Sequence, residues 1–278
     1  MSRMDLAGKT AIVSGAASGI GAALARALAG RGCHLALADI NDEGLEEVAS
    51  GLRSNDRRVT ATVLDVGDEA AINAFAEEVR QTHGEAHLLF NNAGVALGGH
   101  FDQVSPEQFD WLMNINLHGV IRMTRAFLPL IRQQGEGHIT NISSIFGVIA
   151  PAGQTAYSAA KFGVRGFTMA LRHELAGTSV GVTTIHPGGV ATNIAKKALK
   201  GEGVSNDEYE AAMKVADQAL IMPPARAAEI ILRGVERRKP RVFVGRDAHT
   251  LMWMERVFPT CYWSMIKRRL ARIRAEAG

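Results

Sequence analysis

Four polar side chains in the middle of the chain have the types that proton transfer needs: Asn116, Ser144, Tyr157 and Lys161. Tyr157 and Lys161 are four positions apart, so on a helix they lie on one face, one turn apart. A lysine ammonium beside a phenol lowers the phenol pKa from about 10 toward neutral pH. The Ser144 hydroxyl, at the end of an apolar run, can hold a carbonyl oxygen. We therefore predict acid–base chemistry at Tyr157, the alternative being a packed or solvated Tyr–Lys pair.

A glycine-rich turn near the N-terminus has the pattern of a dinucleotide site. It reads SGAASGIG from Ser14 to Gly21, and glycines there let the backbone and the start of a helix approach a pyrophosphate. Asp39 lies 18 residues after Gly21, where its carboxylate would accept both ribose hydroxyls and repel a 2′-phosphate. Neither the turn nor Ile40 and Asn41 offers a Lys or Arg. The pattern favours NAD over NADP, although a tight turn with nothing bound would look similar.

The elements that must position these residues alternate between short apolar runs and helical patterns, which is typical of a parallel sheet. We predict an α/β, Rossmann-like, doubly wound parallel sheet of seven strands with helices on both faces, plus a C-terminal helical extension. The predicted strands are Thr10–Ser14, His34–Asp39, Val59–Leu64, Leu88–Asn91, His138–Ser143, Val180–His186 and Arg241–Val244. The predicted helices are Ile20–Ala29, Glu43–Arg53, Glu69–Thr82, Pro106–Gln133 and Ala156–Ala176.

Composition bounds the class of protein. The 278 residues are 47% hydrophobic and 21% charged with 29 Gly, which excludes a disordered, collagen-like or coiled-coil chain. We expect one domain over residues 1–245 and a C-terminal extension over residues 246–278. Two cysteines and no signal peptide indicate a cytoplasmic protein. His83 and His87 are interrupted by Gly84, so no metal site is expected.

Taken together, the motifs resemble the compact, single-domain branch of the short-chain dehydrogenase/reductase family over about residues 6–245. The matching pieces are SGAASGIG at 14–21, Asp39, Asp65 after VL, NNAG at 91–94, Asn116 in NINL, Ser144 in NISS, YSAAK at 157–161 and HPGGVAT at 186–192. The sequence departs from the family pattern at Ser14, where Thr is usual, and in a tail that is longer than the compact pattern needs.

The resemblance implies a role for each motif. Tyr157 would exchange the proton, Ser144 would orient the substrate oxygen, and Lys161 would bind the nicotinamide ribose and lower the Tyr157 pKa. Asn116 would hold a water in a proton relay. The implied cofactor-binding residues are Gly15, Ser18, Gly19, Ile20, Gly21, Asp39, Asp65, Val66, Asn92, Ala93, Gly94, Tyr157, Lys161, Pro187, Gly188, Val190 and Thr192. A homodimer or homotetramer is the family expectation, supported by the helix at 157–176.

The sequence indicates the polarity of the substrate but not its identity. The residues expected to border the pocket are Val95, Leu97, Phe146, Val148, Ile149 and Ala152, which favours a hydrophobic secondary alcohol or ketone. The alternative is that these side chains only pack. Residues 192–222 are expected to form a lid, whose Lys196, Lys197 and Lys200 either meet an anionic substrate tail or are a solvated face.

The extension concentrates positive charge. Residues 225–278 contain 13 Lys and Arg against five Asp and Glu, whereas residues 1–224 contain 18 against 23. Residues 250–274 are basic and amphipathic with interfacial aromatics, a pattern typical of peripheral membrane contact. The alternative is a helix packed over the substrate cleft or a neighbouring subunit. No nucleic-acid partner is indicated.

The function predicted from the sequence is an NAD-dependent oxidoreductase that interconverts a hydrophobic secondary alcohol and its ketone by Tyr-assisted hydride transfer. Two alternatives remain open at this point. One is an NADPH-dependent ketoacyl or carbonyl reductase, which Asp39 opposes. The other is a dinucleotide-sensing scaffold without turnover, which the complete set of four polar side chains opposes.

Overall fold

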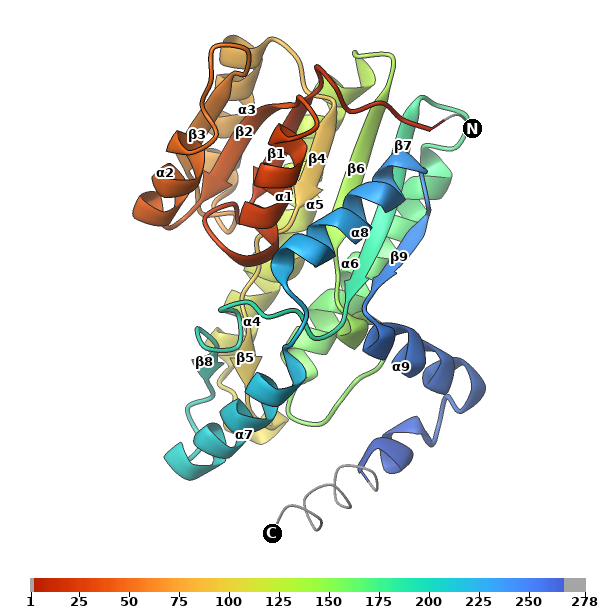
Figure 1. Ribbon diagram of the computed structural model, residues 1–278. Helices are drawn as coiled ribbons and strands as arrows, with labels where there is room; N and C mark the ends of the chain where they lie inside the picture. Colours follow the sequence, from red (N-terminus) through yellow and green to blue (C-terminus); the bar gives the residue numbers. More distant parts are fainter. Residues whose placement is uncertain (1–2, 268–278) are drawn as a thin grey trace.

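The structure, a computed structural model, describes residues 3–267. Its centre is a parallel sheet of seven strands in the order β3-β2-β1-β4-β6-β7-β9 (Figure 1). The strands are β1 (Thr10–Ser14), β2 (His34–Asp39), β3 (Val59–Val63), β4 (Leu88–Asn91), β6 (Gly137–Ile142), β7 (Val180–Pro187) and β9 (Arg241–Val244). A separate pair joins β5 (Leu97–Gly98) to β8 (Leu199–Lys200). The predicted fold class is confirmed.

Helices cover both faces of the sheet (Figure 1). They are α1 (Gly19–Ala29), α2 (Asp42–Ser50), α3 (Glu69–His83), α4 (Pro106–Met113), α5 (Gly119–Arg132), α6 (Thr155–Glu174), α7 (Asn206–Ala219), α8 (Pro224–Glu236) and α9 (Arg246–Val257). Strand residues alternate between the two sides, since Val13 packs with Leu24 and Ile231 whereas Ile12 packs with Phe75 and Phe127. Both faces are apolar, which explains the nearly continuous hydrophobic strands.

The predicted helix over residues 106–133 is one helical path in three parts. Between α4 and α5, residues Asn114–His118 form a π-helical turn, η2. Such turns insert one extra residue and are frequent at functional sites, and this one contains Asn116. Pro129 lies inside α5, near its end as expected.

Two helices, α7 and α8, were not predicted, whereas α9 lies in the expected helical extension. The expected lid region, residues 192–222, contains β8 and α7. In α8 the sequence AAEII buries Ala227, Ala228 and Ile231 against α1, and these apolar residues follow helical spacing. The pattern was therefore readable from the sequence.

The strand order determines where a ligand-binding crevice can form. It reverses at β1, which pairs with β2 on one side and β4 on the other. A crevice opens at such a switch point, at the carboxyl ends of the strands, and ligands bind there in open α/β sheets. Ser14, Asp39 and Asn91 are the last residues of β1, β2 and β4.

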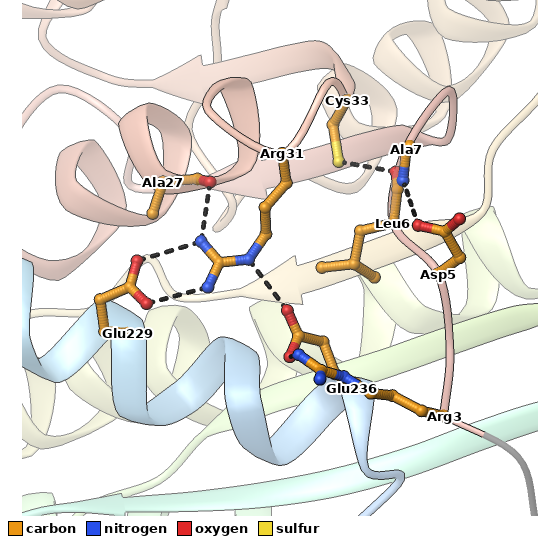
Figure 2. Close-up of polar contacts among 9 residues, drawn as sticks. All are labelled: Arg3, Asp5, Leu6, Ala7, Ala27, Arg31, Cys33, Glu229 and Glu236. Atoms are coloured by element: carbon orange, nitrogen blue, oxygen red, sulfur yellow. Dashed lines mark hydrogen bonds and ion pairs between the residues drawn. The ribbon is translucent and has the colours of Figure 1, made fainter.

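An ionic cluster ties the N-terminal segment to α8 (Figure 2). The Arg31 guanidinium donates to Glu229 at 2.9 and 3.0 Å and to Glu236 at 3.0 Å. Arg3 pairs with the second oxygen of Glu236. Glu236 is buried, so these partners compensate the cost of removing its charge from water.

Candidate active site

The glycine turn after β1 is fastened to the turn after β4. The Ser14 hydroxyl accepts hydrogen bonds from the N–H groups of Asn92 and Ala93, both at 3.1 Å. In return, the Asn92 amide donates to the carbonyls of Ser14 at 3.0 Å and Gly15 at 3.1 Å. The Ser14 hydroxyl thus has a structural use, and the Asn92 side chain holds the glycine turn in place.

The start of α1 forms a backbone cradle in which two positions, Gly19 and Gly21, admit only glycine. Gly19 has φ +54°, and a Cβ there would lie 3.0 Å from the Thr192 methyl. A Cβ on Gly21 would lie 1.9 Å from the Gly15 carbonyl oxygen. Ser18 caps α1 without a side-chain hydrogen bond, so within the described chain the first-turn N–H groups remain available to an anion. These residues fit a pyrophosphate.

Asp39 ends β2 beside the cradle. Its carboxylate accepts from the N–H groups of Ala17 at 3.0 Å and Asn41 at 2.9 Å, which holds it in place with lone pairs to spare. Within residues 3–267 it forms no ion pair with Lys or Arg. The binding of ribose hydroxyls by Asp39 stays a prediction.

The loop after β3 carries the expected adenine-side residues. Asp65 is exposed and accepts from Gly67 N–H at 2.7 Å, while Val66 is buried. The Gly67 carbonyl accepts from Asn114 at 3.2 Å and Arg122 at 3.3 Å. Asn114 and Arg122 are positioning residues that no motif indicated.

Three of the four predicted catalytic side chains meet at the carboxyl end of β6. The Ser144 hydroxyl is near enough to the Tyr157 phenol to lower the pKa of that phenol. The Lys161 ammonium donates to the Ile142 carbonyl at 3.1 Å and lies 5.6 Å from the centre of the Tyr157 ring. The Ser143 hydroxyl donates to the Lys161 carbonyl at 2.8 Å, which joins the end of β6 to α6.

Burial controls the titration of this pair. It lowers the pKa of Lys161 to about 8 and raises the pKa of Tyr157 to about 12, with the hydrogen bond to Ser144 opposing the rise. Lys161 was expected to lower the Tyr157 pKa, but in the protein without cofactor that pKa is raised. Removal of both groups from water outweighs their attraction.

Asn116 is fully buried in the π-helical turn. Its amide accepts from Val95 N–H and donates to the Val95 carbonyl, both at 2.8 Å. The side chain thus holds the loop after β4 beside Tyr157. The water relay expected at Asn116 stays a prediction.

The sequence is similar to those of known oxidoreductases. Residues 9–203 match the family model described as short chain dehydrogenase. This chain belongs to the short-chain dehydrogenase/reductase family. It is 37% identical over 268 residues to SadH of Mycobacterium tuberculosis, covering 95% of this chain and 96% of that protein. It is also 37% identical over 204 residues to oxidoreductase UcpA of Salmonella typhimurium, covering 73% and 77%.

Solved structures of the same family superpose well. A short-chain dehydrogenase/reductase from Burkholderia phymatum in complex with NAD has a TM-score of 0.85 at 29% identity, covering 91% of this chain and 94% of that one. A short-chain dehydrogenase from Mycobacterium paratuberculosis bound to NAD has a TM-score of 0.77 at 26% identity, covering 89% and 100%.

In this short-chain dehydrogenase the predicted nicotinamide loop follows β7, which ends at Pro187. The Gly189 N–H donates to the Asp247 carboxylate at 2.7 Å, and a Cβ on Gly188 would lie 2.0 Å from that carboxylate. Val190 is buried, and Thr192 lies against Gly19. Asp247, in the first turn of α9, is a positioning residue that the sequence did not indicate.

His186 holds the Ser144 backbone in place through a hydrogen bond. Its Nδ1–H donates to the Ser144 carbonyl at 2.9 Å, and its ring stacks on Phe243 at 5.1 Å. Burial lowers the pKa of His186 to about 4, so the ring is neutral at pH 7. The HPGG motif matched the family, but nothing in the pattern showed this contact.

The residues predicted to border the substrate divide into two groups. Phe146 meets the Tyr157 ring edge to face at 6.2 Å, and Val95 and Leu97 pack in the same cluster as Tyr157. Val148 and Ile149 are buried beneath the extension, whereas Ala152 is exposed. The surroundings of Tyr157 are therefore apolar, while Val148 and Ile149 chiefly pack.

The described part of the extension packs over the loop after β6. Tyr262 and Ile266 contact the cluster around Ile145, and the Tyr262 hydroxyl accepts from Ala150 N–H at 2.9 Å. This agrees with the packing alternative for residues up to 267. Residues 268–274 of the predicted amphipathic segment lie outside the described residues.

The remaining candidates are accounted for by local contacts. Lys200 donates to Asn206 at 2.7 Å, whereas Lys196 and Lys197 are exposed. His83 contacts the Thr60 hydroxyl at 3.0 Å. Over residues 3–267 no group of acidic, His and Cys residues could hold a metal ion, and no helix could span a membrane.

Proposed function

We propose that this short-chain dehydrogenase oxidises an apolar secondary alcohol, or reduces the matching ketone, with NAD as cofactor. The observation that carries the proposal is the meeting of Ser144, Tyr157 and Lys161 at the end of β6, beside the glycine cradle of α1. The side chains at the end of β6 can thus transfer a proton, and the glycine turn beside β1, where the strand order reverses, can bind a dinucleotide.

The chain's own residues handle the oxygen and its proton. The Tyr157 phenol gives its proton to, or takes it from, the substrate oxygen, and the Ser144 hydroxyl orients that oxygen. His186 fixes the Ser144 backbone from behind. The cofactor, when bound, supplies the ring carbon that accepts or returns the hydride. Lys161, held by Ile142, places a positive charge beside the phenol.

The choice of NAD follows from Asp39. Its carboxylate is fixed by Ala17 and Asn41, and a phosphate on the ribose would meet this charge without a cationic partner. Solved relatives in complex with NAD agree with this choice. Replacing Asp39 with Ser is expected to raise activity with NADP relative to NAD by on the order of tenfold.

The apolar substrate follows from Phe146, Val95 and Leu97 around the phenol. A polar alcohol would lose hydration there without new partners. We therefore expect kcat/KM to rise with the length of the alkyl groups on the carbinol carbon, by roughly threefold to fourfold per buried methylene.

The testing experiment is a steady-state assay of purified protein with NAD and NADP against a homologous series of secondary alcohols. Tyr157→Phe is expected to lower kcat about 10²- to 10⁴-fold while NAD still binds. Tyr209→Phe is the matched control, since within residues 3–267 the Tyr209 hydroxyl has a single hydrogen-bond partner, the Ala198 carbonyl. Equal loss in both variants, or full activity in Tyr157→Phe, would contradict the proposal.

A further inference from the structure

The extension has an inner and an outer apolar side. Its inner side is the set that packs on the loop after β6, represented by Ala248, Tyr262 and Ile266. Its outer side consists of Trp253, Val257, Phe258 and Met265, whose exposed fractions are 58%, 57%, 42% and 40%. In Figure 1, α9 projects from the carboxyl end of the sheet. About half of the surface of these four side chains is therefore open to solvent in the described chain.

Such a set is unusual for a surface that meets only water. Single exposed apolar residues are ordinary, but a group that contains Trp and Phe on one segment marks a contact surface. Trp253 and Val257 are four positions apart on α9, so they lie on one helical face.

The charge of the same segment indicates what the surface meets. Residues 246–278 contain seven Lys and Arg against three Asp and Glu, and residues 267–274 contain five basic and no acidic residues. Arg256, between Trp253 and Val257, and Lys267, two residues after Met265, are exposed. A second copy would bring the same positive charge against itself, whereas an anionic lipid surface complements it.

We propose that the extension docks on an anionic membrane surface through Trp253, Val257, Phe258 and Met265. The apolar side chains enter the boundary between headgroups and acyl chains, and the basic residues face the lipid phosphates. Docking is peripheral. It does not depend on turnover, so it stands or falls separately from the proposed function.

Vesicle co-sedimentation of the full chain tests this inference. Binding to phosphatidylcholine vesicles that contain phosphatidylserine is expected to exceed binding to pure phosphatidylcholine vesicles, and to weaken as salt is raised. The double variant Trp253→Ser/Phe258→Ser is expected to weaken binding by about tenfold or more. Equal binding of the variant and the parent protein would overturn the proposal.

Two controls separate the alternatives. Phe101→Ser removes a ring that is 71% exposed on η1 (Phe101–Gln103), which is not part of the extension, and is expected to leave vesicle binding unchanged. Sedimentation velocity of the double variant detects the other occupant, since loss of an oligomer without loss of vesicle binding would assign the surface to a second copy. Unchanged NAD affinity and unfolding temperature show that the variants are folded.

Discussion

At the residue scale, the chemistry depends on side chains that act on each other's position. Ser144 is held from two directions, since His186 binds its carbonyl and its hydroxyl accepts from Phe146 N–H at 3.1 Å. Lys161 is buried and Tyr157 is half-buried, and loss of hydration pushes their pKa values in opposite directions. The neutral phenol is therefore the resting form at pH 7, ready to donate a proton to a ketone oxygen.

This resting form predicts opposite pH dependence for the two directions. Oxidation needs Tyr157 without its proton, and the raised pKa of about 12 makes that form scarce at pH 7. We expect kcat/KM for alcohol oxidation to rise as pH increases from 7 to about 10, while that for ketone reduction does not rise. Initial rates in both directions across this range check the prediction, and a fall in oxidation with pH would contradict it.

Asp247 carries a second residue-scale prediction. Asp247→Ala removes the acceptor of the Gly189 N–H bond and frees the loop that is predicted to position the nicotinamide. Loss of about 1 kcal/mol of hydrogen-bond energy is expected to raise KM for NAD about fivefold with a smaller effect on kcat. Asp207→Ala, an exposed first-turn position on α7, is the matched control. An unchanged KM for NAD would remove Asp247 from the positioning residues.

The sequence pointed to the candidate catalytic residues more readily than to the residues that hold them in place. Tyr157, Lys161, Ser144 and Asp39 were identifiable because their types and spacing are tied to chemistry. Asp247, His186 and Tyr262 were not, since each acts through a backbone group brought near only by the fold. The Tyr157 pKa also escaped prediction, because spacing reports the neighbouring charge but not the depth of burial.

At the scale of elements, each strand end and helix start is shaped by its local sequence. Asp68 caps α3 by accepting from the N–H groups of Ala70 and Ala71, whereas Ser18 leaves the start of α1 uncapped. The difference separates a structural helix start from one suited to an anion. Strand and helix periods predicted the seven strands of the central sheet and α1, α2, α3 and α6 closely, but not the short pair β5 and β8. The π-helical turn at Asn116, which divides the predicted helix over residues 106–133, leaves no trace in that period.

Glycine substitutions test the role of the cradle. Gly19→Ala forces φ +54° on an L-residue and brings its Cβ to 3.0 Å from Thr192. The free energy of unfolding is therefore expected to fall by about 1–2 kcal/mol. Gly166→Ala on α6 meets no atom within 4 Å and is expected to stabilise the fold by about 0.5–1 kcal/mol. Chemical denaturation and NAD titration measure both effects. Equal effects of the two changes would contradict a special role for Gly19.

At the scale of the whole molecule, ion pairs join segments that are far apart in the chain. Arg31 bonds with Glu229 and Glu236 on α8 (Figure 2), and Glu136 pairs with Lys9 and Arg238. The side-chain hydrogen bonds lower the pKa of Glu229 and of Glu136 below the ordinary carboxyl range. These carboxylates are charged in the folded protein at pH values where the unfolded chain begins to bind protons.

The resulting stability is present above the ordinary carboxyl pKa and is lost as pH falls through the lowered values. We expect the unfolding temperature to drop on acidification from about pH 5 downward, and Arg31→Gln to flatten that drop. Thermal unfolding at a series of pH values, with Arg26→Gln on α1 as the control, measures this. An identical acid profile for Arg31→Gln and the parent protein would contradict the account.

Self-association is the second whole-molecule prediction. Phe162 and Met169 on α6 and Trp111 on the neighbouring α4 are exposed by 39%, 37% and 38%, which leaves an apolar face for another copy. We propose a homodimer or homotetramer through this face. Sedimentation velocity is expected to show it, and Phe162→Glu/Met169→Glu is expected to yield a monomer. A monomeric parent protein would contradict the proposal.

The most direct test of the central claim, hydride transfer to NAD with Tyr157 as the proton carrier, follows the hydride itself. An apolar secondary alcohol deuterated at the carbinol carbon is turned over with NAD, and the reduced nicotinamide is examined by NMR. The account predicts deuterium on the nicotinamide ring with the parent protein and with Tyr209→Phe, and almost none with Tyr157→Phe. Equal transfer by Tyr157→Phe, or product formation without deuterium on the nicotinamide, would contradict it.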